Sequence, residues 1–335
     1  MENSILKETE AKTVRENEDN ILEVRGLKKY FPIRGGFFNT VVGQVKAIDG
    51  ISFSLKRGST MGLVGESGCG KTTTGRTILR LSGEKTAGDV LFNGKEVYDI
   101  PKSELNELRT KMQIIFQDPF SSLSPRLPVG EIIGEAVKEH HLVPKEEYED
   151  YIDRIMDNCG LQPFHKGRYP HEFSGGQRQR ICIARALALN PEFVVCDEPV
   201  SALDVSIQAQ IINLLRDYQE ESGTAYLFIA HDLSMVRYVS DEVGVMYLGQ
   251  LVELCEAEEI YAHPLHPYTR GLLGAIPVAN PKLARQKVKS SIEGDIPSPI
   301  HPPSACRFHT RCPFATEKCK EEEPVLKDMG GGHLC

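Results

Sequence analysis

The stretch GESGCGKT, at residues 65–72, has residue types and spacing suited to phosphate binding. It fits the pattern G-x-x-x-x-G-K-[ST] and lies between TMGLV and KTTTGRTILRL, an order that predicts strand, loop and helix. In such a loop the glycines let backbone N–H groups turn toward phosphate oxygens, Lys71 adds a positive charge and the Thr72 hydroxyl can bind Mg²⁺. A chance glycine-rich turn is the alternative, which this context disfavours. The predicted nucleotide-contacting residues here are Gly65, Glu66, Ser67, Gly68, Cys69, Gly70, Lys71, Thr72 and Thr73.

Two acidic residues follow a short apolar run, FVVCDEP, farther along the chain. Asp197 comes after four strand-type residues, where a carboxylate can hold Mg²⁺ through water. Glu198 comes next, where it can orient or deprotonate an attacking water. His231 ends a second apolar run, AYLFIAH, and could contact the γ-phosphate of a nucleotide. An Asp-Glu pair alone is usually a solvated turn and a lone histidine at a strand end is usually structural, so both assignments depend on the other motifs of the chain.

The stretch FSGGQRQR resembles the signature sequence of ABC transporter ATPases, which usually reads LSGGQ, with Phe173 as the departure. A serine and two glycines at the start of a helix form an anion site. The resemblance implies that the signature of one subunit completes the ATP site of another, so that two cassettes close head to tail around two ATP molecules. The implied contact residues are Ser174, Gly175, Gly176 and Gln177.

The same resemblance assigns roles to other motifs. IIFQDP is similar to the Q-loop, SALD to the D-loop with Asp204 at the dimer interface, and His231 matches the switch histidine. Phe31 is the better match for the aromatic residue that stacks on adenine and Tyr30 is the alternative, although either could belong to the core. The implied Mg²⁺ ligands are Thr72, Gln117 and Asp197, and the implied catalytic residues are Glu198, His231, Gln117 and Lys71.

The pattern of elements predicts an α/β fold that can hold these residues. Runs at 21–31 and 45–56 alternate like antiparallel strands, and DVLFNGKEV predicts a hairpin with Asn93-Gly94 at its turn. Strands alternating with helices then predict a mainly parallel sheet with ligands at the carboxyl ends of its strands. With the resemblance, we expect a P-loop NTPase (RecA-like) core, an antiparallel β subdomain, a helical signature subdomain and a small cysteine-bearing extension. The expected divisions are a leader at 1–20, an ATPase domain at 21–262 with its helical subdomain at about 118–180, and an extension at 263–335.

Composition limits the class of protein. The chain has 335 residues, 40% apolar residues and a net charge of −8, which argues against a nucleic-acid surface. The first twenty residues lack the apolar region of a signal peptide, and no apolar run approaches the ~20 residues of a spanning helix. We therefore expect a protein of the cytosol.

The C-terminal part narrows the resemblance. HPLHPYTRGLLGAIP and the Pro-rich stretch after it are similar to the extension of oligopeptide and dipeptide importer ATPases, and KKYFPIRGG points to the F-type subunit. This implies a heterodimer with a D-type ATPase, two membrane permease subunits, an extracytoplasmic peptide-binding protein and a place at the cytoplasmic face of the membrane. A DNA-repair or translation ATPase, an exporter ATPase and an importer of nickel or sugars stay as alternatives. His263 and His266 in HPLHP could bind metal, but we expect Pro-fixed turns opening a short helix.

The nine cysteines divide into two groups. Five of them, including Cys69, lie on apolar segments or near element ends, where we expect packing. The other four are Cys306, Cys312, Cys319 and Cys335, with five, six and fifteen residues between them. A reducing compartment and this wide spacing favour a [4Fe–4S] cluster, with zinc or unligated thiols as alternatives and His309 or His333 as substitute ligands. Some members of the similar family hold such a cluster, and we expect it to staple the extension in place.

Overall fold

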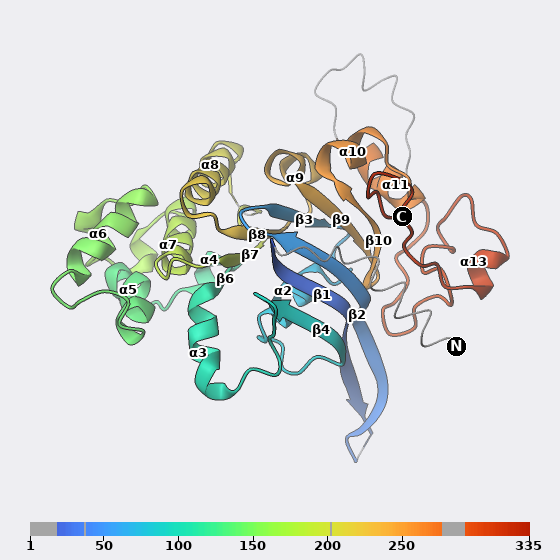
Figure 1. Cartoon of the computed structure of the whole chain (residues 1–335), viewed down its shortest axis with the longest axis horizontal. Helices are drawn as coiled ribbons and strands as arrows, with labels where there is room; N and C mark the ends of the chain where they lie inside the picture. The colour runs from blue at the N-terminus through green and yellow to red at the C-terminus, as the bar shows by residue number, and fades with distance from the viewer. Residues whose placement is uncertain (1–18, 37, 202, 277–291) are drawn as a thin grey trace. The chain divides into compact units, whose positions relative to one another are not determined.

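The computed structural model describes residues 19–36, 38–201, 203–276 and 292–335 (Figure 1). These residues form two compact units. The first combines the described residues of Met1–Lys56, Thr60–Asp99 and Ala230–Cys335, and the second combines Arg57–Ser59 with Ile100–Ile229. Most of the predicted leader, residues 1–20, therefore lies outside the described residues.

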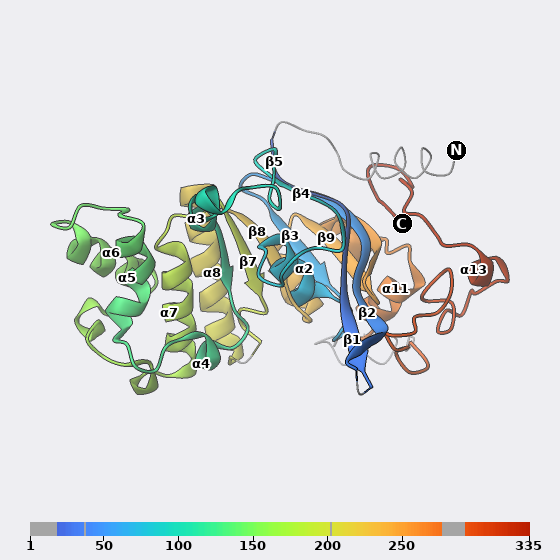
Figure 2. The same ribbon diagram turned by 90° about the horizontal axis from the view of Figure 1, so that it is seen from below.

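A four-stranded antiparallel sheet dominates the beginning of the first unit and curves strongly in Figure 2. Its strands, in the order β2-β1-β4-β5, are β1 (Asn20–Gly35), β2 (Thr40–Lys56), β4 (Ala87–Phe92) and β5 (Lys95–Glu96). Asn93 and Gly94 both have positive φ angles, 50° and 74°, as the tight hairpin turn predicted for this pair requires. The antiparallel subdomain is confirmed, with its first two strands longer than the sequence suggested.

The rest of the first unit carries the phosphate loop and the C-terminal segment. Its elements are β3 (Thr60–Val64), α2 (Lys71–Ile78), α9 (Leu233–Val239), β9 (Glu242–Tyr247), β10 (Gln250–Glu256), α10 (Ala257–Ala262), α11 (Pro267–Gly274) and α13 (Lys318–Glu321). β3 pairs in parallel with β9, which pairs antiparallel with β10. Gly62 allows α9 to lie against β3, because a Cβ there would meet Val236 at 2.4 Å.

The helix predicted in the HPLHP region is confirmed. α11 begins at Pro267, whose missing N–H costs nothing in a first helical turn. His266 caps it, since its Nδ1 accepts a hydrogen bond from the Tyr268 N–H at 3.1 Å. The chain end returns to the sheet, where Leu334 and Leu254 exchange backbone hydrogen bonds of 2.8 and 2.9 Å.

The second unit contains a short parallel sheet and a group of helices. Its sheet strands are β6 (Met112–Ile115), β7 (Phe193–Asp197) and β8 (Ala225–Ile229), paired in parallel. Every residue of β7 and β8 is buried, as is typical of parallel strands covered on both faces. Helices α3 (Lys102–Lys111) and α8 (Val205–Ser222) connect these strands to the rest of the unit.

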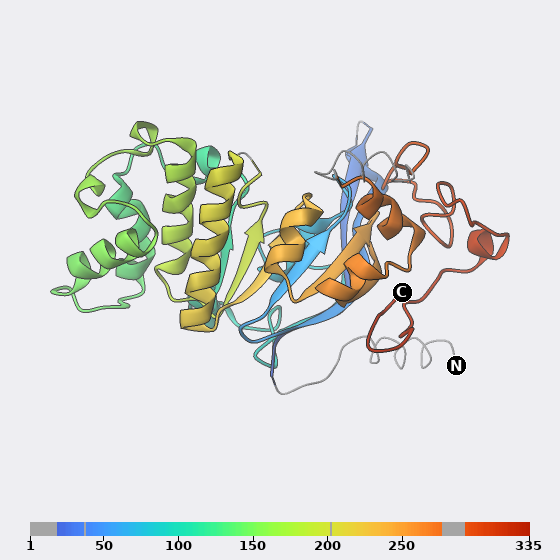
Figure 3. The same ribbon diagram turned by 90° about the horizontal axis from the view of Figure 1, so that it is seen from above.

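The helical part of the second unit surrounds the predicted signature. Its helices are α4 (Pro119–Ser122), α5 (Val129–Glu139), α6 (Tyr148–Asn158), the short η1 (Pro163–His165) and η2 (Pro170–Glu172), and α7 (Gly175–Leu187). In Figures 2 and 3, α7 runs beside α8. Close approach is possible there because Gly176 lacks a Cβ, which would lie 2.8 Å from Ile207.

The expected fold class is confirmed, since a parallel α/β sheet, an antiparallel sheet and a helical signature region are all present. The strand β6 and the hairpin β9–β10 were not predicted from the sequence. No helix within the described ranges is long and apolar enough to cross a membrane.

Candidate functional site

The phosphate loop has the backbone geometry that its glycines predicted. Gly65, Gly68 and Gly70 have φ angles of 151°, 80° and 115°, values that side-chain-bearing residues rarely adopt. A Cβ on Gly65 would lie 2.2 Å from the Met246 carbonyl oxygen, and one on Gly70 would lie 2.3 Å from that of Ala47. The loop therefore forms a tight cradle in front of α2 that only this glycine pattern permits.

The inner part of the loop is organised around Lys71. This lysine is 5% exposed, and its Nζ donates to the carbonyl oxygens of Gly65 at 2.8 Å and Glu66 at 3.2 Å. Burial raises the pKa of the Cys69 thiol despite the nearby Lys71 charge, so the thiol stays protonated and packs as a small apolar group. Thr72 and Thr73 follow at the start of α2, both half-buried.

The second unit brings three other predicted residues to one edge of its sheet. Asp197 is fully buried at the end of β7, and Glu198 follows with a φ of 47°, a strained value for a residue with a side chain. Its backbone is fixed, since its N–H donates to the Ile229 carbonyl oxygen at 2.9 Å. Gln117 lies just beyond β6, which ends at Ile115, and its Nε2 donates to Glu198 Oε2 at 2.7 Å. The structure thus brings the side chains of Gln117 and Glu198 together, although their catalytic roles stay predictions.

The signature serine caps α7 through reciprocal bonds. The Gln177 N–H donates to Ser174 Oγ at 3.4 Å, and the Ser174 N–H donates to Gln177 Oε1 at 3.0 Å. This capping box leaves Gly175 and Gly176 at the positive end of the helix dipole. Asp204 lies at the N-cap of α8 and is exposed. His231 is exposed directly after β8, in the first unit.

The two aromatic candidates on β1 differ in their surroundings. Phe31 is 38% exposed, with the Lys29 ammonium group 5.0 Å from its ring centroid. Tyr30 is half-buried and its hydroxyl donates to Asp49. Although burial alone favours protonation, the Tyr30 hydrogen bond and the Arg307 charge hold the pKa of Asp49 below its usual value. Phe31 therefore has the ring surface to stack on a base, whereas Tyr30 is engaged within the protein.

The sequence did not reveal that the C-terminal segment reaches the phosphate loop. Arg311 donates from Nη1 to Glu66 Oε2 at 2.8 Å and from Nη2 to Glu66 Oε1 at 3.2 Å. The Glu66 N–H donates to the Tyr268 hydroxyl at 2.8 Å. Both partners lie more than 200 residues from Glu66, so no local spacing could have predicted them.

The predicted metal site at the four C-terminal cysteines is wrong. Within the described ranges, no three His, Cys, Asp or Glu side chains are placed to hold a metal ion. Cys306 is near Cys312 and Cys319, and its N–H donates to the Cys319 carbonyl oxygen at 3.1 Å. Cys335 follows Leu334, which pairs with Leu254 of β10, so the chain end is held at that strand.

Neither a [4Fe–4S] cluster nor zinc is supported at these cysteines, and the same absence of a metal group applies to the histidines of HPLHP. The other five cysteines are buried as expected: Cys69, Cys159, Cys182, Cys196 and Cys255.

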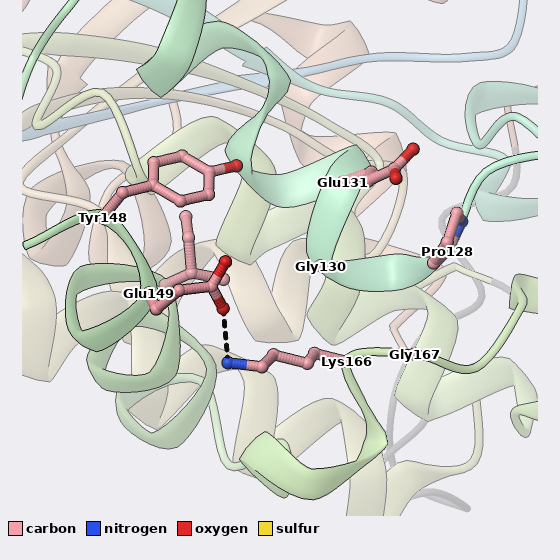
Figure 4. A pocket seen from close by; sticks show the side chains of 8 residues that line it. Pro128, Gly130, Glu131, Tyr148, Glu149, Lys166 and Gly167 are labelled. Atoms are coloured by element: carbon pink, nitrogen blue, oxygen red, sulfur yellow. Dashed lines mark hydrogen bonds and ion pairs between the residues drawn. The ribbon is translucent and has the colours of Figure 1, made fainter. Parts of the chain in front are cut away.

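A separate pocket of about 230 Å³ lies among the helices of the second unit (Figure 4). It is lined by Pro128, Gly130, Glu131, Tyr148, Glu149, Ile152, Lys166 and Gly167. Lys166 Nζ is engaged by Glu149 at 2.7 Å and Asp153 at 3.0 Å. None of the predicted ATP-site residues lines this pocket, and its lysine is already neutralised.

Comparisons with known proteins agree with these observations. The ABC transporter family matches residues 48–201, and the oligopeptide/dipeptide transporter C-terminal region matches residues 252–319. The oligopeptide transport ATP-binding protein AppF of Bacillus subtilis is 52% identical over 319 residues, covering 95% of this chain and 97% of AppF. YkfD of the same organism is 49% identical over 94% of each chain. These relatives do not favour a role in DNA repair or translation.

Solved structures are similar as well. CbiO1 of Clostridium perfringens, part of an ABC transporter complex, has a TM-score of 0.64 and 26% identity, covering 80% of this chain and 98% of CbiO1. The ATP-binding cassette MJ0796, solved with ADP and phosphate, has a TM-score of 0.63 and 25% identity over 70% of this chain and 98% of its own.

Proposed function

Because this chain belongs to the oligopeptide transport ATP-binding proteins of the ABC transporter family, we propose that it hydrolyses ATP to power the import of oligopeptides or dipeptides. The observation that carries the proposal is the near full-length match to such a protein, which includes the C-terminal region. In this role it would act with a second, D-type ATPase subunit, two membrane permease subunits and an extracytoplasmic peptide-binding protein. It would lie at the cytoplasmic face of the membrane.

The loop of the first unit would bind the triphosphate. Backbone N–H groups of this loop and the Lys71 charge would provide electrostatic stabilisation where negative charge develops on the γ-phosphate. Phe31 would stack on the adenine ring. The signature residues Ser174, Gly175 and Gly176 would face the ATP of the partner cassette, where the dipole of α7 favours an anion.

The second unit would activate the attacking water. Glu198 would accept its proton, and Gln117 would orient that carboxylate through the 2.7 Å hydrogen bond. The oxygen donors of Thr72, Gln117 and the buried Asp197 suit Mg²⁺, which would neutralise charge on the phosphates. His231 and Asp204 would contact the γ-phosphate and the facing subunit, respectively.

Substitution of the proposed base tests this assignment. Glu198→Gln keeps the shape of the side chain but cannot accept a proton, so ATP should still bind while hydrolysis falls by about 10²-fold or more. The variant should also accumulate as an ATP-bound closed dimer, measurable by size-exclusion chromatography. Glu220→Gln, an exposed glutamate on α8, is the matched control and should hydrolyse ATP normally. Wild-type turnover by Glu198→Gln would remove Glu198 from this role.

Co-purification tests the transport part of the proposal. The chain should co-purify with the two permease subunits and the D-type subunit, and a peptide-loaded binding protein should stimulate ATP hydrolysis by the complex. Stimulation by a nickel-loaded or sugar-loaded binding protein, but not a peptide-loaded one, would contradict peptide import.

A further inference from the structure

Glu66 lies inside the phosphate loop, so its carboxylate adds negative charge to a loop that is proposed to hold a polyanion. Two like charges a few ångströms apart repel each other strongly unless a cation lies between or beside them. In this structure the cation is Arg311 of the C-terminal segment, which meets both carboxylate oxygens in a forked ion pair at 2.8 and 3.2 Å.

The pair is protected from solvent on the arginine side. The Arg311 side chain is 6% exposed and that of Glu66 is 24% exposed, so water screens their attraction only in part. The glutamate raises the pKa of Arg311, and the guanidinium stays charged at every physiological pH. The Glu66 charge is therefore neutralised continuously while the segment is docked.

Glu66 is also held through its backbone. Its N–H donates to the Tyr268 hydroxyl, its carbonyl oxygen accepts from Lys71 Nζ at 3.2 Å, and the same oxygen accepts from the Cys69 N–H at 3.2 Å. Glu66 thus joins the phosphate-binding lysine to two residues from beyond β10. Any displacement of Arg311 is expected to alter this turn of the loop.

A cluster of aromatic rings holds both residues that contact Glu66, Tyr268 and Arg311, in position. Phe308 is 2% exposed and lies three residues before Arg311, with its ring centroid 5.4 Å from that of Tyr268 and 5.2 Å from that of Tyr247. The rings of Tyr247 and Tyr268 also meet at 4.7 Å. These packed side chains therefore hold Arg311 beside the phosphate loop.

We propose that Arg311 is a positioning residue for ATP binding, which neutralises and holds Glu66 so that the phosphate loop accepts the triphosphate. The inference rests on the proposed ATPase function and extends it, because it makes the C-terminal segment part of the nucleotide site. Without the arginine, the Glu66 carboxylate turns toward the phosphates and repels them.

A double-mutant cycle tests the proposal, with binding of a non-hydrolysable ATP analogue measured by calorimetry on the full chain. Arg311→Gln should weaken affinity by about tenfold in the wild-type background, and much less in the Glu66→Gln background, where no carboxylate remains to be neutralised. Arg311→Lys keeps the charge but loses the fork, so its affinity should be intermediate. In ATPase assays the KM for ATP should rise with little change in kcat.

The control is Arg237→Gln, which breaks an exposed pair with Glu258 in the same unit, at 2.9 Å, and should leave affinity unchanged. An Arg311→Gln affinity within twofold of the wild type overturns the inference. Equal losses in both Glu66 backgrounds overturn it too, because they indicate a purely structural role. If Arg311→Gln does not fold, the Arg311→Lys variant carries the same comparison. Failure of the wild type to bind the analogue would refute the proposed ATPase function instead.

Discussion

Phe308→Ala should release the C-terminal segment from the first unit. The Phe308 ring is almost completely buried and lies 5.2 to 5.6 Å from the rings of Tyr247, Tyr268 and His266. Truncating a buried phenylalanine costs about 3 to 5 kcal/mol, from lost apolar burial and the cavity left behind. Because a terminal segment can rearrange around the cavity, we expect the lower end, about 3 kcal/mol.

This cost lowers the free energy that favours the docked C-terminal segment over the undocked one. At 25 °C, about 3 kcal/mol raises the undocked population roughly a hundredfold. Hydrogen exchange reports it directly, because the Leu334 N–H is protected by its 2.8 Å bond to Leu254 and becomes exposed on undocking. Exchange at Leu334 should accelerate by about that factor, and urea unfolding should show a lower midpoint.

Phe314→Ala is the matched control, since Phe314 lies in the same segment but is 66% exposed. Its removal should change stability by less than about 0.5 kcal/mol. Equal exchange rates at Leu334 in the two variants would refute the reasoning, because the Phe308 ring would then not hold the segment.

Two further predictions concern the loop and its supporting helix. Gly65→Ala should abolish nucleotide binding in calorimetry, because the new Cβ would lie 2.2 Å from the Met246 carbonyl oxygen. The Cβ of Gly68→Ala would meet open space, so this variant should cost only about 1 kcal/mol of backbone strain. Similar losses of binding in both variants would contradict the cradle geometry. Burial lowers the pKa of His266 to about 4, so between pH 6.5 and 4 a proton binds the unfolded chain but not the folded one. The free energy of unfolding should therefore fall by about 3 kcal/mol as the pH falls through this range. His266→Asn keeps a capping side chain and cannot titrate, so urea unfolding at pH 7 and 4.5 should show a smaller loss; equal losses would show that His266 does not titrate as described.

The sequence predicted the phosphate loop well because the loop is made by consecutive residues. Its glycines, lysine and threonine lie within eight positions, and their φ angles follow from the lack of a Cβ. The hairpin at Asn93-Gly94 was predictable for the same reason. Strand β7 was also readable, because its first four residues are the apolar run expected of a buried parallel strand, and the acidic pair Asp197 and Glu198 at its end then stands out.

The C-terminal segment was misread because its contacts are distant in sequence. The spacing of its cysteines suggested convergence, but nothing local indicated that Leu334 would pair with β10 and hold the chain end at that strand. The sequence CRFHTRC does place Phe308 between Arg307 and Arg311, and arginines form strong, often bidentate, hydrogen bonds with carboxylates.

The two arginines of this stretch reach both ends of the proposed nucleotide site. Arg311 pairs with Glu66 in the phosphate loop, and Arg307 pairs with Asp49, which also accepts the Tyr30 hydroxyl on the strand that carries Phe31. A metal site would have linked residues within the segment, whereas these ion pairs link the segment to the phosphate loop and to strand β2. Loss of the segment should therefore weaken phosphate and adenine contacts together, because one short stretch supports both.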